Sequence, residues 1–90
     1  MFQVTEEAAA HAAYQLTRAG TPEGTVMRLI GHDNGLTLEP GQIEPGDLTF
    51  DHDGRPVVAV SSALAEDLRN VVLQAEETDE GTRLQVRERG

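Results

Sequence analysis

The chain has 90 residues, with 16 acidic side chains against seven arginines, a net charge of −9, and no cysteine or lysine. Without cysteine it cannot form disulfides, thiol nucleophiles, zinc fingers or thiolate-held iron-sulfur clusters. The negative charge argues against non-specific binding to nucleic acid or to anionic membranes, because both depend on Lys and Arg side chains that neutralise phosphates.

The length predicts one domain, residues 1–90, with a thin aliphatic core. Such a small core gives modest stability, and self-association into a homodimer or larger homo-oligomer is a common remedy. No apolar run approaches the roughly 18 residues of a membrane span, and the N-terminus lacks the features of a signal peptide. We therefore expect a cytoplasmic protein that does not contact membranes.

The first elements in chain order are a short strand over residues 1–4 and a helix over residues 6–19. Thr5 precedes Glu6 and Glu7, as is typical of a helix N-cap. Small apolar residues recur at helical spacing on one face, which predicts a buried stripe: Ala9, Ala12, Ala13 and Leu16. The opposite stripe is polar and includes His11. Gly20 is the expected left-handed terminator.

Three segments with a period of two then predict antiparallel hairpins. The first has its tip at Asn34-Gly35, where we expect a type I′ turn, and a loop follows over residues 40–45. The second turns at Asp53-Gly54, and Pro56 marks either the entry of its second strand or a sheet edge. The third turns near residues 79–81.

A short helix after the second hairpin is capped by Ser61 or Ser62. Arg83 and Arg87 alternate with apolar residues, so we expect them on the solvated face of a strand, paired with Glu on its neighbour. The acidic run at residues 76–80 is expected to be a solvated hairpin tip. The whole predicts an α+β fold: a small strand-dominated domain of antiparallel hairpins with one Ala-rich helix and one short second helix.

The candidate metal ligands are His32 and Asp33 on the first tip and His52 on the second, because imidazole and carboxylate together suit Zn, Mn or Fe(II). Exposed turns also collect Asp, Asn and Gly for backbone reasons alone. The segment at residues 51–54 resembles the start of a calcium loop, but position 55 is Arg55 and the twelfth position is Ser62, which excludes that site.

The sequence supports a catalytic site less well than it supports a metal site. His32 is a candidate acid-base residue, but the chain has no G-x-S-x-G elbow and no glycine-rich phosphate loop. A domain this thin is also expected to lack a pocket of the roughly 300 Å³ that ligands need. His11 is expected to be a solvated helix residue beside Glu7. The sequence thus predicts that the protein is not an enzyme.

Taken in order, the segments VTEEAAAHAAYQLTRAG, MRLIGHDNG, GDLTFDHDGRPVVAVSSALAEDLRN and EGTRLQVRE resemble the HesB-like family, the A-type carriers of iron-sulfur cluster assembly related to IscA. The resemblance covers nearly the whole chain. It implies a compact strand-rich fold, a tendency to form dimers, and a cluster held by three cysteines, one on a glycine-rich tip and two in a Cys-Gly-Cys tail.

Those cysteines have no counterpart here: Asp33 stands at the tip position, and the chain ends at Gly90 without the tail. One hard carboxylate cannot replace three soft thiolates on a cluster. The interpretation is a cysteine-free HesB-like protein with no cofactor, which acts as a protein-binding or regulatory module and whose partner is another protein. The alternative is a hard-metal protein that uses His32, Asp33 and His52.

Overall fold

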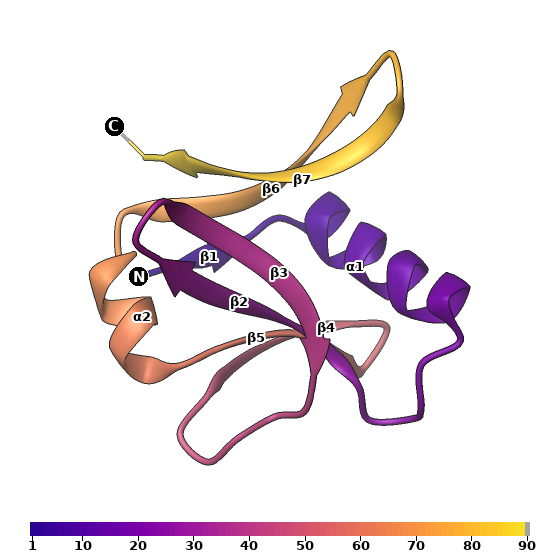
Figure 1. The fold of residues 1–90 in the computed structure, drawn as a ribbon, viewed down its shortest axis with the longest axis horizontal. Coiled ribbons are helices and arrows are strands. Elements are labelled where there is room, and N and C mark those ends of the chain that lie inside the picture. The colour runs from indigo at the N-terminus through magenta and orange to yellow at the C-terminus, as the bar shows by residue number, and fades with distance from the viewer. Residues whose placement is uncertain (90) are drawn as a thin grey trace.

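The structure, a computed structural model, describes residues 1–89. Its elements in chain order are β1 (Gln3–Val4), α1 (Glu6–Ala19), β2 (Val26–His32), β3 (Gly35–Gly41), β4 (Leu48–His52), β5 (Arg55–Val60), α2 (Ser62–Asp67), β6 (Val71–Thr78) and β7 (Gly81–Glu88). Helix α1 packs against strands of both sheets, and the β6–β7 hairpin projects above it (Figure 1). The predicted α+β fold class, with three hairpins and two helices, is confirmed.

Local signals account for helix α1. The N–H of Ala8 donates to Thr5 Oγ1 at 3.1 Å, which satisfies one of the free donors of the first turn. Gly20 ends the helix at φ +66°, and its N–H donates to the carbonyls of the last turn. The predicted bounds, cap and terminator are all confirmed. The buried face consists of Ala8, Ala9, Ala12 and Leu16, whereas Ala13, which was predicted to belong to it, is only partly buried. The small alanines let the helix approach the sheets closely.

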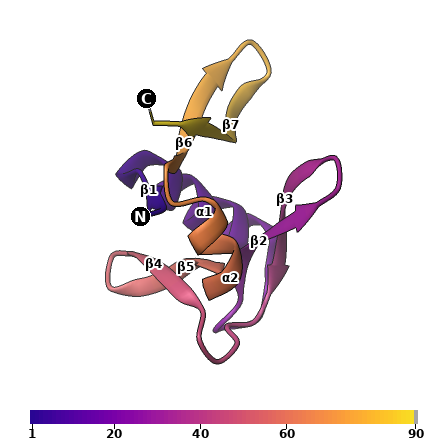
Figure 2. The same ribbon diagram turned by 90° about the vertical axis from the view of Figure 1, so that its left-hand side faces the viewer.

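Four strands form a sheet in the order β3-β2-β5-β4, and three form a second sheet in the order β1-β6-β7. The hairpin pairs β2–β3, β4–β5 and β6–β7 are antiparallel, as predicted. The parallel pairs β2–β5 and β1–β6 were not predicted, because they join segments that are distant in sequence. Figure 2 shows the β6–β7 and β2–β3 hairpins diverging from the body of the domain.

The core consists of apolar side chains from α1, the central strands and β6, and none of the polar or charged residues among residues 1–89 is buried as a whole. Strand β5 lies between β2 and β4, and its residues Val57 to Val60 are fully buried on both faces. Pro56 therefore marks the entry of a central strand, and the edge alternative was wrong. The loop expected over residues 40–45 is shorter, because β3 extends through Pro40 to Gly41.

The first hairpin turn differs from the expected one. His32 pairs with Gly35, so the two loop residues are Asp33 and Asn34, and the type I′ turn centred on Asn34-Gly35 was wrong by one residue. Among residues 1–89, Asp53 is the only non-glycine residue with positive φ. It stands at φ +53° beside Gly54 at φ +81°, so the second hairpin has the conformation that was expected of the first.

We predict that Gly35→Val lowers the free energy of unfolding by about 1–3 kcal/mol, because Gly35 has φ +138°, a region that a β-branched residue adopts only under strain. No other atoms would lie within 4 Å of the added Cβ, so backbone strain is the sole cause. The control is the exposed neighbour His32→Ala, which should change stability by less than about 0.5 kcal/mol. Urea unfolding of both variants checks this, and equal losses would contradict it.

No helix among the described residues is both long enough and apolar enough to cross a membrane.

Candidate functional site

The side chains predicted to bind a metal on the two hairpin tips contact different sets of residues. His32 is half exposed, and its Nε2 lies 2.9 Å from Thr37 Oγ1 and 3.8 Å from a carboxylate oxygen of Glu39. Asp33 is exposed on the turn. His52 lies between two carboxylates, with Nδ1 3.1 Å from Glu6 Oε1 and Nε2 3.3 Å from Asp53 Oδ2.

The sheet register places these tips at opposite ends of the four-stranded sheet. Strands β2 and β5 are parallel, with Leu29 opposite Val60. His32 lies beyond that pair at the end of β2, whereas His52 precedes the start of β5. In the described part of the chain, no three His, Asp or Glu side chains form a group that could hold a metal ion. The structure thus does not bring His32, Asp33 and His52 together at one site.

His11 differs from its expected role as a solvated helix residue. It is half buried, its Nε2 is buried without a hydrogen-bond partner, and its ring stacks on Tyr14 with the centroids 6.1 Å apart. The helical spacing alone did not reveal this, because α1 packs against strands that are distant from it in sequence. Arg83 behaves as predicted, since its Nη2 lies 3.6 Å from Glu76 Oε2 on β6. Arg87 lies opposite Val72, so it lacks the expected Glu partner.

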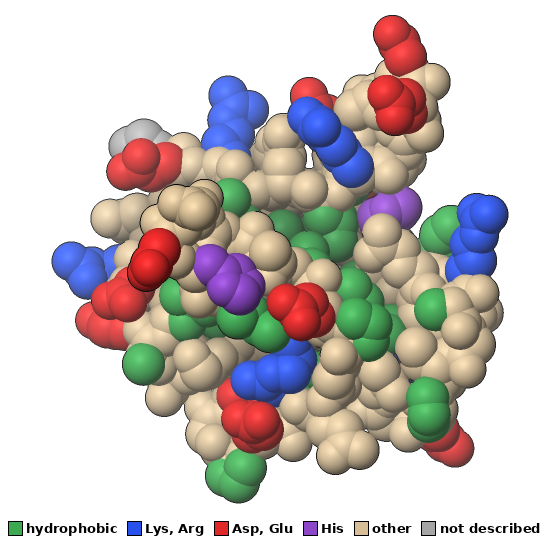
Figure 3. Space-filling view, in the orientation of Figure 1, with side chains coloured by type: hydrophobic (Ala, Val, Ile, Leu, Met, Phe, Trp, Pro, Cys, Tyr) green, Lys and Arg blue, Asp and Glu red, His purple; other side chains and the backbone are tan. Residues whose placement is uncertain are grey.

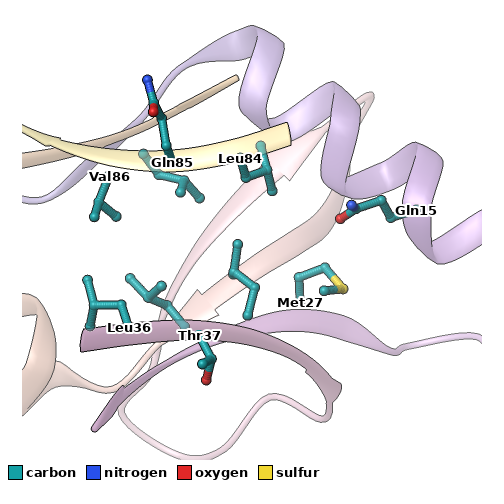
Figure 4. A pocket seen from close by; sticks show the side chains of 10 residues that line it. Gln15, Met27, Leu36, Thr37, Leu84, Gln85 and Val86 are labelled. Carbon is teal, nitrogen blue, oxygen red and sulfur yellow. The ribbon is translucent and has the colours of Figure 1, made fainter. Parts of the chain in front are cut away.

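A groove without an assigned role lies between the two sheets, and most of the side chains that line it are aliphatic (Figure 4). Its volume is about 470 Å³, so the expectation of no pocket above roughly 300 Å³ was wrong. The lining comes from both sheets and from α1: Gln15, Met27, Leu29, Leu36, Thr37, Leu38, Leu73, Leu84, Gln85 and Val86. No charged side chain belongs to this lining.

The two walls of the groove end in edge strands. Strand β3 is an edge of the four-stranded sheet and β7 an edge of the three-stranded sheet. Val86 and Leu84 of β7 point into the groove toward Leu36 of β3 (Figure 4). Val86 is 40% exposed, a large fraction for an aliphatic residue. Figure 3 shows apolar side chains gathered in the hollow between β3 and the β6–β7 hairpin. The groove is therefore accessible, and most of its lining side chains are aliphatic.

An ion pair that the sequence did not reveal holds the segment between β3 and β4. Arg28 on β2 donates from Nη1 to Asp47 Oδ2 and, at 2.9 Å, to the carbonyl of Gln42. Asp47 also accepts from the N–H of Glu44 at 2.8 Å. The hydrogen bond from Arg28 lowers the pKa of Asp47 from its ordinary value, against the opposing effect of burial. This cluster is structural, because its carboxylate is 3% exposed and already paired.

No family model matches the sequence, and no curated protein matches it. Solved structures do match the fold. Escherichia coli SufA, involved in biosynthesis of iron-sulfur clusters, superposes with a TM-score of 0.75 at 20% identity, covering 97% of this chain and 84% of that chain. The structure of IscA with the [2Fe-2S] cluster superposes with a TM-score of 0.61 at 18% identity, covering 98% and 85%. The chain therefore has the IscA/SufA fold that the resemblance implied.

Proposed function

We propose that this protein is a non-enzymatic, cytoplasmic binding module of the IscA-like fold, which holds a polypeptide partner in its apolar groove and carries no iron-sulfur cluster. It also associates with itself. The proposal combines the fold of two iron-sulfur proteins with a sequence that has no cysteine. The observation that carries it is the uncharged, accessible groove between the two sheets.

The side chains of this chain do not fit a cluster. Clusters are held chiefly by thiolates, and the chain has none. At the tip of the first hairpin the nearby donors are the carboxylates of Asp33 and Glu39 and the imidazole of His32, which already contacts Thr37. Hard carboxylates on an exposed hairpin do not provide the three soft ligands that such a cargo requires. Cluster chemistry therefore contributes no step to the proposed function.

The groove suits the apolar side chains of another polypeptide. Its floor is built from the buried residues Leu29 and Leu73, so the base is rigid. Its walls carry partly exposed aliphatic side chains, and filling the groove would remove them from water, at about 25 cal/mol per Å² of apolar surface. The amide group of Gln15 can supply a hydrogen bond without the desolvation of a charge, whereas the side chains of Gln85 and Thr37 point away from the groove (Figure 4). Accessible apolar hollows of this kind are typical of protein-binding surfaces.

Site-specific photo-crosslinking in the producing cell tests this proposal. A benzophenone amino acid replaces Leu36, which points into the groove (Figure 4), or the control residue Thr49, which is exposed on the edge strand β4. We expect position 36 to crosslink to another protein, detected by mass spectrometry, and position 49 not to do so. Further addition of Val86→Glu should abolish the crosslink, because it places a charge in the groove, whereas Thr49→Glu should leave it unchanged. Equal crosslinking from both positions would contradict the proposal.

A further inference from the structure

The groove between the two sheets continues toward the last turn of α1. A second hollow, of about 420 Å³, is lined by that turn and by further residues that include Met27. Gln15 and Met27 line both hollows, so the two adjoin and form one extended groove. Figure 4 shows Val86 and Leu36 at one end of the first hollow and Gln15 and Met27 at the other. The extended groove therefore runs from the edge strands β3 and β7 to the end of α1.

The extended groove contains one charged side chain. Among residues 1–89, Arg18 is the only charged residue that lines either hollow, and it takes part in none of the ion pairs. The chain has 16 acidic side chains, yet in this part of the structure none of them lines the extended groove or pairs with this guanidinium. The groove thus presents a local positive charge on a protein whose net charge is −9.

Tyr14 restrains the position of that positive charge. Nη1 of Arg18 donates to the Tyr14 hydroxyl oxygen at 3.0 Å, and the guanidinium carbon lies 6.0 Å from the centroid of the Tyr14 ring. The two residues are four apart on α1, so their side chains lie on the same face of the helix. A hydroxyl is neutral and occupies only one of the several N–H donors of an arginine. The remaining donors, and the charge, are available to an anion.

The carbonyl groups at the end of α1 already have partners. The N–H of Gly20 donates to the carbonyl of Thr17 at 3.1 Å, and the hydroxyl of Thr21 donates to the carbonyl of Leu16 at 3.1 Å. The helix dipole favours a cation in this turn, but it provides no carboxylate that would neutralise one. The chain itself therefore leaves the guanidinium of Arg18 without an anionic partner.

We propose that the polypeptide held in the groove carries an acidic residue beside its apolar residues, and that this carboxylate pairs with Arg18. The inference rests on the proposed function and specifies the chemistry of the partner. The apolar side chains fill the hollow between Leu36 and Val86, while the Asp or Glu reaches the last turn of α1. At physiological ionic strength charges are screened beyond about 8 Å, so this local charge, rather than the net charge of the protein, selects the residue bound there.

An arginine at this end of the groove also fixes the orientation of the bound segment. The planar guanidinium binds a carboxylate through two parallel hydrogen bonds, which a neutral side chain cannot reproduce. A segment with Lys or Arg at the same point is rejected by like charge. The first hollow thus supplies burial of apolar surface, and the second supplies discrimination between partners.

Selection from a phage-displayed library of random linear peptides tests this inference. The library is panned in parallel on the wild type, on Arg18→Glu, on the control Arg87→Glu, and on Val86→Glu, which places a charge in the first hollow. Arg87 is a matched control because it is exposed, lies outside the lining of both hollows and, among residues 1–89, also takes part in no ion pair. Circular dichroism checks that each variant is folded.

We expect the wild type and Arg87→Glu to enrich peptides in which Asp or Glu stands beside an apolar run. Arg18→Glu should enrich Lys or Arg at that place instead, and Val86→Glu should lose the acidic apolar peptides. An acidic preference that persists on Arg18→Glu would overturn the pairing with Arg18, while the proposed function would stand. If no enriched peptide is lost on Val86→Glu, the groove is not a binding surface and both proposals fail.

Calorimetry with one enriched synthetic peptide measures the size of the effect. Replacing its acidic residue by the corresponding amide should raise the Kd for the wild type about threefold, a size typical of an exposed ion pair. The same replacement should leave the Kd for Arg18→Gln unchanged, because this variant removes the positive charge without reversing it. Equal losses of affinity on both proteins would show that the carboxylate contacts another group, which would contradict the inference.

Discussion

Replacing Leu29 by alanine is expected to lower the free energy of unfolding by about 2–5 kcal/mol. Leu29 is 3% exposed and belongs to β2, a central strand of the four-stranded sheet, so its removal leaves a cavity at the floor of the groove. Urea denaturation monitored by far-UV circular dichroism measures the loss.

The matched control for this prediction is Leu84→Ala. From the sequence alone the two leucines are equivalent, and both would be expected to lose about 2–5 kcal/mol. The structure distinguishes the two leucines by their burial, because Leu84 is only partly buried on the wall of the groove. We therefore expect Leu84→Ala to lose less than half of what Leu29→Ala loses. Equal losses would show that the groove is closed around Leu84 in solution, contrary to the structure.

The second large effect is expected from Asp47→Asn. This change preserves shape but removes the charge that pairs with Arg28, whose side chain is 15% exposed. We expect a loss of about 1.5–3 kcal/mol at neutral pH, the range for hydrogen bonds to charged groups. The control is Glu44→Gln, which removes a mostly exposed carboxylate 3.8 Å from the same arginine and should lose less than about 1 kcal/mol.

The pH dependence gives this prediction a second readout. The pKa of Asp47 is lower in the folded protein than in the unfolded chain, chiefly because its carboxylate accepts a hydrogen bond from Arg28. Its contribution to stability is therefore complete above the unfolded pKa of about 3.9 and is lost as the pH falls through the folded pKa. The stability difference between wild type and Asp47→Asn should shrink as the pH falls below about 4. A difference that grew in acid would contradict the assignment.

Local chemistry explains which parts of the fold the sequence could predict. Thr5 and Gly20 determine the ends of α1 through contacts within a few residues, so the helix bounds agree with expectation. The Asp53-Gly54 turn likewise sets its own hairpin. At the first tip, Asn34-Gly35 was misplaced by one residue, because the hairpin register puts Asp33 and Asn34 in the loop and leaves Gly35 as the first residue of β3.

The features that required the structure join distant segments. The parallel pairing of β2 with β5 has no local signature, yet it decides that the tips at His32 and His52 lie at opposite ends of a sheet. The contact between Arg28 and Asp47 spans 19 residues. The groove is lined by strands of both sheets and by α1, and alternation along one strand cannot indicate what lies opposite it. The candidate site was thus the part that sequence patterns predicted least.

Anaerobic reconstitution with ferrous iron and sulfide tests the central claim most directly, because the claim is that an iron-sulfur carrier fold persists here without the means to hold a cluster. After desalting, the wild-type protein is expected to show no charge-transfer absorbance in the visible range and no bound iron or sulfide. Asp33→Cys serves as a comparison that adds one thiolate at the tip. Stoichiometric visible absorbance in the wild type, lost on His32→Ala or Asp33→Ala, would contradict the account.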